Sequence, residues 1–572
     1  MEAALIKTAF PHGLYKGICM TAQALELEGR FWRVSTGLVL ALSLALRLFG
    51  IGWGMPDYSF SPPASKPYHN TFHMDEDNFL WGLAQMRPSE GDFDVHDYHW
   101  GTLQHYLIYG ALLLGSAAGV VPQPWEGAFR SGDTDMLPRL YILGRLVSVV
   151  AGVACTLVVI GLGAALAGRM AGLGAGVAYA FSPLAVVEAH YLTSDVTMSA
   201  LVAAATLSSV RAVQRGRFKW LVMAGLLLGL ATAAKYSAVF AATALLVAQL
   251  GVWRSVRAAA FLSFLLIFML PWLATMGGFV LGEPYTLIMP AAVLEGLEAA
   301  KGNALDLSLG IGPPLEMVGW QALNLAGLGL TWPIALLSLV GLIIMVAQVV
   351  TARRKSESRL GVVLRLSPSN LRDASMLSPA IVVLVAIAGL VLGLSLSRFH
   401  MLRYSQPLMP LLAVAAGVAW VAVPRPALRW AAGALAVFVA AWITLGQLSL
   451  MLAPHPANVL LSWLRDHVRP GQQVARVWPE YPLLDDRLYD LIRLDPWQPD
   501  LPPGIHPDYI ILDDMQYGPP TDALTGLLAR EYKEVARFSA KPHICSFAWD
   551  EGTTPHDWKY SHPTFMVYTR DQ

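Results

Sequence analysis

Acidic side chains are concentrated in the first polar stretch of the chain, residues 54–100, where Asp75, Glu76 and Asp77 are consecutive. The following apolar positions recur at helical spacing and predict a helix that begins near Asp75. Carboxylates in the first turn of a helix suit its free amides and dipole, so Asp77 is interpreted as a capping group. Asp75 and Glu76 are equally compatible with a catalytic role, in which a carboxylate takes the proton of an attacking hydroxyl.

A further acid, Asp195, begins an apolar run in the segment SPLAVVEAHYLTSDVTMSA. It follows Thr193 and Ser194, so a plain helix-capping role is open. An ionisable residue at the edge of a membrane span is also a functional candidate when it faces a cavity.

Cationic residues that could bind an anion occur next to two other apolar runs. Lys235 lies between two apolar segments with almost no loop, and Arg403 and Tyr404 begin the segment RYSQPLMPLL. Either cation could extend its head group to the membrane surface. Beside an acidic site, two cations would instead suit a phosphate, which an arginine can hold with two hydrogen bonds. Arg47 and Arg145, inside apolar runs, are expected to pair with acids elsewhere.

The histidines of the first polar stretch, His73, His99 and His105, follow no spacing typical of zinc ligands. Packing or contact with a substrate is therefore the expected role. The three cysteines are far apart and also suggest no metal site: Cys19, Cys155 and Cys545.

The composition indicates insertion into a membrane. Of 572 residues, 55% are hydrophobic and 14% are charged, whereas soluble domains carry about 25% charged residues. The mean hydropathy is +0.49. Several apolar runs reach the ~20 residues that cross a bilayer. The formal net charge is zero, so no nucleic-acid partner is expected.

Twelve apolar segments could span a membrane, and basic loops orient them. The loops Arg211–Lys219 and Arg353–Arg372 belong on the cytoplasmic side, as does the basic N-terminus. Because the N-terminus and the Arg211–Lys219 loop are both on the cytoplasmic side, the number of spans between them must be even, so one of the five segments there does not span. The polar start of 101–121 suggests that this segment is an interfacial helix on the outer side. Eleven spans remain, unless 317–350 contains two. The segments are 34–53, 101–121, 140–167, 170–187, 196–212, 218–234, 238–252, 257–281, 317–350, 378–397, 403–422 and 428–451.

The chain is therefore predicted to be a mostly α-helical polytopic membrane protein in three parts. Residues 1–33 form a cytoplasmic segment without signal-peptide features. Residues 34–452 form the transmembrane domain, with 54–139 as a first extracytoplasmic loop that contains interfacial helices. Residues 453–572 alternate helix-like and strand-like stretches and predict a small extracytoplasmic α/β domain.

The order of these motifs resembles the glycosyltransferase C superfamily, in particular the branch of protein O-mannosyltransferases and bacterial aminoarabinose transferases (family 39 type). The resemblance extends over about residues 34–450. It rests on the Asp75–Glu76 pair, followed in order by YHWGTLQHYL, GRLVSVVAGVACTLVVIGLGAALAG, the segment ending at Asp195, GLLLGLATAAKYS and RYSQPLMPLLA.

The resemblance implies a polyprenyl-phosphate or dolichyl-phosphate sugar as donor, and transfer with inversion. It implies Asp75 as the general base for an acceptor hydroxyl, with Glu76 and Asp195 completing the acidic site. Lys235, Arg403 and Tyr404 would bind the donor phosphate, whose charge grows as it leaves.

Features of the superfamily that this sequence lacks narrow the expected acceptor, cofactor and membrane. No WWDYG-like motif occurs in the tail, which disfavours transfer to asparagine. This also disfavours a version in which Asp75 and Asp195 hold Mg²⁺ or Mn²⁺, so no cofactor is expected. The 282–316 loop is too short for the β-trefoil of eukaryotic protein mannosyltransferases, which favours a bacterial inner membrane. The acceptor stays open among protein, lipid and glycan hydroxyls.

Two alternatives to an enzyme remain. A transporter or flippase of lipid-linked sugars would usually place its ionisable groups near the bilayer midplane, within repeated halves. Here the charges gather on one face and no repeat is evident. A catalytically inactive scaffold is the other alternative.

Overall fold

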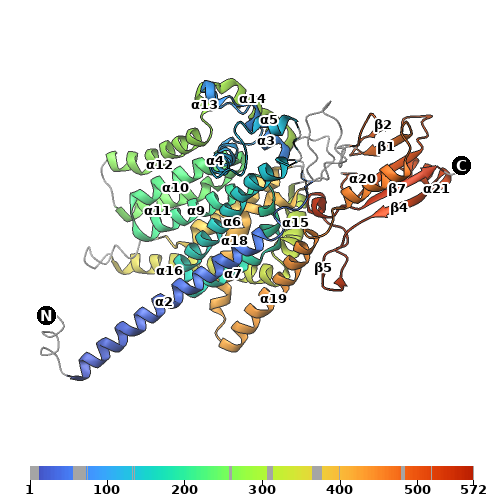
Figure 1. Cartoon of the computed structure of the whole chain (residues 1–572). Coiled ribbons are helices and arrows are strands. Elements are labelled where there is room, and N and C mark those ends of the chain that lie inside the picture. Colours follow the sequence, from blue (N-terminus) through green and yellow to red (C-terminus); the bar gives the residue numbers. More distant parts are fainter. Residues whose placement is uncertain are drawn as a thin grey trace.

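The computed structural model describes residues 12–55, 73, 75–131, 133, 135–256, 261–305, 314–363, 377–397, 400–477, 484–516 and 518–570. Long helices form a bundle, and a small sheet lies beside one end of it (Figure 1). Part of the predicted basic loop, residues 364–376, lies outside the described residues.

Eight helices in the described part of the chain are long and apolar enough to cross a membrane. A further pair, α7 with α8 and η3, would make a ninth span that is bent by 67°. The chain is therefore an integral membrane protein, as its composition predicted. The eight spans are Gly29–Leu48 of α2 (His12–Leu48), α6 (Leu137–Ala167), α9 (Asp195–Arg215), Tyr236–Arg254 of η4 and α11 (Tyr236–Ala241, Ala242–Val256), Phe264–Gly282 of α12 (Phe261–Gly282), Trp332–Ala352 of α16 (Trp332–Val363), Leu402–Ala422 (η8, Leu402–Leu408, and α18, Met409–Ala422) and α19 (Pro426–Leu450).

Two shorter apolar helices are α10 (Phe218–Ala234) and α17 (Ala380–Leu396). The bent pair consists of α7 (Arg169–Phe181), α8 (Pro183–Val187) and η3 (Glu188–His190). Together with the eight long helices, these elements correspond to the eleven predicted spans in order and position. The number eleven itself stays a prediction, because α10 and α17 are 17 residues long and just short of a full crossing.

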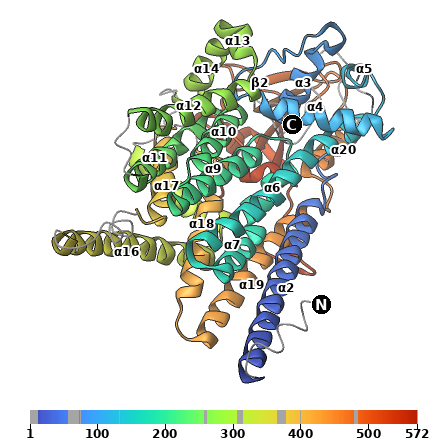
Figure 2. The same cartoon turned by 90° about the vertical axis from the view of Figure 1, so that its left-hand side faces the viewer.

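The first loop folds into short helices at one end of the bundle, where α3, α4 and α5 lie together (Figures 1 and 2). They are α3 (Glu76–Gln85), the 3-10 turn η2 (Pro88–Glu90), α4 (Leu103–Ala117) and α5 (Glu126–Ser131). The predicted helix after Asp75 is confirmed, and its apolar positions are buried: Phe79, Leu80, Leu83 and Met86. The 101–121 segment forms the 15-residue α4, shorter than a span.

The apolar run 317–350 is broken. It contains the end of α15 (Pro314–Asn324), the short π-helical segment η6 (Leu325–Gly329) and most of α16. Because α15 has 11 residues, α16 alone is long enough to span. Before it, the 282–316 loop contains α13 (Tyr285–Ile288) and α14 (Pro290–Leu305).

Glycines let α10 and α12 touch through their backbones. A Cβ on Gly229 would lie 2.0 Å from the carbonyl oxygen of Thr275, and one on Gly278 would lie 2.3 Å from that of Leu226. Small residues permit this close approach of membrane helices. The end of α10, which carries Lys235, is thereby fixed against α12.

The C-terminal part contains the predicted α/β structure. A five-stranded sheet has the order β2-β1-β3-β7-β4; β1 is parallel to β2 and β3, and β7 is antiparallel to β3 and β4. The helix-like stretch after residue 455 forms α20, and the strand-like stretches form β3 and β7. The elements are α20 (Pro456–His467), β1 (Gln473–Val477), β2 (Asp490–Leu494), β3 (Tyr509–Asp513), α21 (Asp522–Glu531), β4 (Tyr532–Phe538), the small pair β5 (His543–Ile544) and β6 (Phe547–Ala548), η9 (His556–Ser561) and β7 (Phe565–Arg570).

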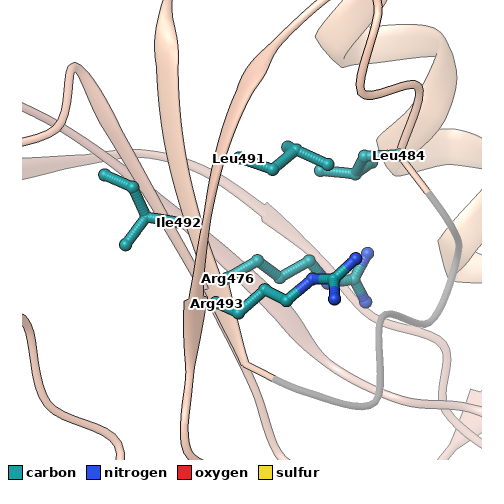
Figure 3. Close-up of a pocket in the computed structure, with 5 residues that line it drawn as sticks. All are labelled: Arg476, Leu484, Leu491, Ile492 and Arg493. Carbon is teal, nitrogen blue, oxygen red and sulfur yellow. The ribbon is translucent and has the colours of Figure 1, made fainter.

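A small pocket lies on this sheet, where Arg476 and Arg493 stand opposite each other on β1 and β2 (Figure 3). The remaining lining residues are Leu484, Leu491 and Ile492. None of the predicted site residues lines this pocket.

Candidate active site

The first loop and the start of η8 meet through an ion pair. Asp75 is the N-cap residue of α3, but its side chain makes no capping hydrogen bond. Instead, its Oδ2 lies 2.6 Å from Nη1 of Arg403, the second residue of η8. The Asp75 side chain is 19% exposed and that of Arg403 is 8% exposed. The structure thus brings together two of the segments that were predicted to contribute to one site.

A second ion pair joins α9 and α10. Asp195 is the first residue of α9, and its Oδ1 lies 2.7 Å from Nζ of Lys235, which follows the end of α10. The Lys235 ammonium also lies 5.0 Å from the centre of the Tyr404 ring. Because Tyr404 follows Arg403, both ion pairs belong to one cluster of charges.

Glu76 points into the protein and not toward Arg403. Its two carboxylate oxygens accept hydrogen bonds from Nε and Nη2 of Arg145, each 2.8 Å long, and one also accepts from the Leu192 backbone amide. Glu76 and Arg145 are fully buried. Arg145 therefore has the acidic partner that its apolar surroundings predicted, and Glu76 anchors α3 to α6.

Asp77 is also tied to α6, since its Oδ1 accepts a hydrogen bond from the Tyr141 hydroxyl. Burial raises the pKa of Asp77 well above its usual range, while the Tyr141 hydrogen bond opposes this shift. In place of the expected cap, Asp77 makes a side-chain contact that fixes the helix.

Of the three candidate histidines, His73 lies in the cluster. Nη1 of Arg403 donates a 3.2 Å hydrogen bond to His73 Nε2. Burial, with the Arg403 charge, holds the pKa of His73 well below its usual range, so the ring is neutral and can accept. His99 is half exposed and pairs with Asp97, and the buried His105 packs 4.8 Å from the Phe79 ring.

Two acids of the cluster were not singled out from the sequence. The Asp557 carboxylate, from η9, accepts hydrogen bonds from the backbone amides of Leu402 and Arg403, 3.0 and 2.8 Å long. Burial raises the pKa of Asp557, and Arg403 opposes this shift. Glu188 of η3 is buried and interacts electrostatically with Asp195, Arg403, Asp557 and Lys235. In the sequence, Glu188 could have been found as an acidic residue inside an apolar stretch. No sequence pattern distinguished Asp557 from the other acids of the C-terminal part.

The cluster has the groups needed for attack by a hydroxyl on a phosphate-linked carbon. Asp75 is a partly exposed carboxylate, and Arg403 Nε is buried without a hydrogen-bond partner among the described residues. Among all the residues that the structure describes, no group of three or more His, Cys, Asp or Glu side chains is arranged to hold a metal ion. The expectation that no divalent ion is required stays a prediction.

Comparison with known proteins gives one family. Residues 142–276 match the sequence model of dolichyl-phosphate-mannose-protein mannosyltransferases. This segment contains Arg145, Asp195 and Lys235. No curated protein sequence matches the chain.

Three solved structures are similar to the chain at low sequence identity. ArnT from Cupriavidus metallidurans, bound to undecaprenyl phosphate, has a TM-score of 0.43 and 12% identity, covering 93% of this chain and 97% of that one. The archaeal oligosaccharyltransferase AglB from Archaeoglobus fulgidus, with an inhibitory peptide and a dolichol-phosphate, has a TM-score of 0.45 and 11% identity, covering 81% and 65%. The mycobacterial arabinofuranosyltransferase AftD has a TM-score of 0.35 and 16% identity, covering 94% and 41%.

These TM-scores are too low to carry an argument about the site. The family match over α6 to α12 is independent of them, and it covers part of the segment in which the ordered motifs were found. Over the residues that it covers, the match agrees with the resemblance to the glycosyltransferase C superfamily that those motifs indicated.

Proposed function

We propose that this protein transfers a hexose or pentose from a polyprenyl-phosphate donor to an acceptor hydroxyl, with inversion at the sugar carbon. The observation that carries the proposal is the pairing of Asp75, the most exposed acid of the cluster, with Arg403. At one accessible point, a carboxylate can take the proton of the attacking hydroxyl, and a guanidinium can bind the phosphate that leaves.

Asp75 is the best candidate for the base. Its carboxylate is 19% exposed, whereas Asp195 is 3% exposed and Glu76 is fully buried behind Arg145. A base must come within hydrogen-bond distance of the proton it removes. Glu76 supports Asp75 indirectly, by anchoring the start of α3 to α6.

Arg403 and Lys235 are the candidate ligands of the donor phosphate, with Tyr404 between them. Arg403 Nε has no hydrogen-bond partner among the described residues, and one donor of Lys235 is bound to Asp195. A phosphate that binds Arg403 competes with Asp75 for the guanidinium. The Asp75 carboxylate is then released from the ion pair and can accept a hydrogen bond from the acceptor hydroxyl.

In the proposed step, Asp75 takes the proton of the acceptor hydroxyl and the oxygen bonds to the anomeric carbon. The bond from this carbon to the phosphate oxygen breaks, and the electron pair leaves with the lipid phosphate. Fixed cations stabilise that growing negative charge, so no separate acid is needed. Attack from the face opposite the phosphate accounts for inversion.

We further propose that the site faces the extracytoplasmic side of a bacterial inner membrane, with the N-terminus in the cytoplasm. The basic segment Arg211–Lys219 supports this orientation, because it begins in the last turns of α9, at the end opposite Asp195. The C-terminal domain then lies on the same side as the donor and the acceptor. The acceptor is a hydroxyl of a protein, lipid or glycan.

The test is release of labelled sugar from a panel of undecaprenyl-phosphate sugars by the purified protein, with cell-envelope extract as acceptor. Asp75→Asn should lose turnover in the presence or absence of EDTA. Asp92→Asn is the matched control, since Asp92 also pairs with an arginine of the first loop, Arg87, at 2.9 Å. It should retain turnover.

Equal turnover in wild type and Asp75→Asn would remove Asp75 as the base. Absence of turnover with every donor, in protein that is folded, would overturn the proposed activity and favour a transporter or scaffold. Loss of wild-type turnover in EDTA would show that a divalent ion is required.

A further inference from the structure

We infer that Asp557 is a positioning residue for Arg403, and that the C-terminal domain thereby forms part of the active site. This inference rests on the proposed function, because it assigns Arg403 to the donor phosphate. It also makes a structural claim that can be tested without any substrate.

The contact is made between a buried carboxylate and two consecutive backbone amides. Asp557 accepts from the Leu402 amide at 3.0 Å and from the Arg403 amide at 2.8 Å. These are the first two residues of η8, whose amides lack partners within the helix. Asp557 thus fixes the backbone from which the Arg403 side chain extends toward Asp75.

The turn that carries Asp557, η9, is itself held in place by contacts of its other residues. Tyr560, one turn later in η9, packs its ring 4.9 Å from the His73 ring, and its carbonyl oxygen lies 3.0 Å from Nε2 of His455. Lys559 forms a 3.3 Å ion pair with Asp514 at the end of β3. The turn is therefore attached both to the sheet domain and to the residues around Arg403.

This arrangement distinguishes positioning from simple docking of a domain. A docking contact would place an acid against any surface group of the membrane domain. Asp557 instead holds the residue that pairs with Asp75, and Tyr560 covers the histidine to which Arg403 donates. One contact thus holds the Arg403 backbone, and the other packs on the ring that accepts from the Arg403 side chain.

The consequence of losing Asp557 follows from geometry. A misplacement of about 1 Å at a catalytic group can lower a rate by about 100-fold. We expect Asp557→Asn, which keeps one acceptor oxygen, to raise KM for the donor about 10-fold, and Asp557→Ala to have the larger effect. Asp550→Asn is the control, since Asp550 is an exposed acid of the same domain.

The substrate-free arm measures hydrogen exchange in the peptide 401–408. This peptide should exchange faster in Asp557→Asn than in wild type or Asp550→Asn, because one of the two amides of Leu402 and Arg403 loses its acceptor, with the thermal midpoint retained. Unchanged exchange would overturn the inference, whatever the enzyme does with sugars. Because Asn is nearly the same size as Asp, this variant remains informative even if Asp557→Ala fails to fold.

The functional arm uses Arg403→Ala as a background. If Asp557 acts through Arg403, adding Asp557→Asn to Arg403→Ala should cause no further loss of affinity for undecaprenyl phosphate. An equal additional loss in both backgrounds would overturn the positioning role and leave a general structural one. Binding of this lipid is measured without turnover, so failure of the transferase proposal would be seen separately in the sugar-release assay.

Discussion

Asp75 and Glu76 are consecutive in the chain, yet their carboxylates bind different arginines. Asp75 pairs with Arg403 at a partly exposed point, and Glu76 forms a fully buried double hydrogen bond with Arg145. The acidic pair thus divides into one residue suited to chemistry and one that fixes the fold.

Substitution of Asp75 should affect activity far more than stability. The carboxylate is 19% exposed, so Asn can be solvated in its place. We expect a loss of about 10²- to 10⁴-fold in kcat, the range for removal of a general base, with a thermal midpoint near that of wild type. Single-turnover sugar transfer and a thermal unfolding scan in detergent check the two parts. A large fall in the midpoint would contradict this assignment.

Glu76→Gln should have the opposite profile. Removal of one partner of a buried ion pair leaves the other charge uncompensated and costs about 3–5 kcal/mol. Arg145 would be that charge, because it is buried beside Glu76. The thermal midpoint is the measurement, and the double variant Glu76→Gln with Arg145→Met should recover part of the loss. If Glu76→Gln were as stable as wild type, the buried pair would not anchor α3.

Arg403→Lys should weaken donor binding although it retains the charge. The Arg403 guanidinium serves Asp75 and His73 through Nη1 and still has Nε without a partner among the described residues. A lysine ammonium cannot reproduce this planar arrangement. We expect KM for the donor to rise about 10-fold, a cost of about 1.4 kcal/mol. Arg87→Lys, at an exposed pair of the first loop, should leave KM unchanged.

Gly101→Ala should disturb the site from a distance. A Cβ on Gly101 would lie 2.0 Å from the carbonyl oxygen of Ala233, two residues before Lys235. Backbone must then shift, so we expect both lower stability and lower turnover. Gly110→Ala is the matched control, because a Cβ at that position in α4 meets no atom within 4 Å. The inference of a tight contact fails if the two variants behave alike in unfolding scans and sugar transfer.

The buried Glu283 should give the stability a measurable pH dependence. Burial raises its pKa to about 7 in the folded protein, from an unfolded value of 4.5. The folded state thus binds the proton more tightly, and this group stabilises the protein as pH falls from about 7 toward 4.5. At pH 8 the ionised group costs about 3 kcal/mol.

Glu283→Gln should therefore have a higher thermal midpoint than wild type at pH 8, with the difference shrinking as pH falls and vanishing below the unfolded pKa of 4.5. Glu90→Gln is the matched control, since it makes the same change at an exposed side chain. A constant difference for Glu283→Gln would show that this carboxyl does not titrate as described.

The order of the motifs along the chain was enough to predict which segments meet. Asp195, Lys235 and Arg403 lie at the ends of apolar runs and Asp75 lies in the first loop, and parity of the spans places all four on one side of a membrane. Because ion pairs form between whatever charges share a face, the clustering followed from topology. Burial of the α3 face followed in the same way from its helical spacing.

Other contacts depend on how helices rotate and pack, which local patterns do not encode. The partner of Glu76 could not be named, since Arg145 is 69 residues away and many arginines were available. His105 was grouped with His73 by proximity in sequence, but α4 turns it toward Phe79. Asp557 lies in a short turn without periodicity, so its contact with η8 required the three-dimensional arrangement.

The last strand has a consequence for the timing of synthesis. β7 pairs with both β3 and β4, and η9 with Asp557 directly precedes it. The ribosome makes this strand after the membrane helices described above, so the sheet cannot close around η9 until β7 has been synthesised. A nascent chain interrupted before residue 565 would carry Asp75, Asp195, Lys235 and Arg403 in the bilayer without the closed sheet. Catalytic competence would thus be confined to chains that have been synthesised through β7, and prematurely terminated products would leave the cell's supply of lipid-linked sugar untouched.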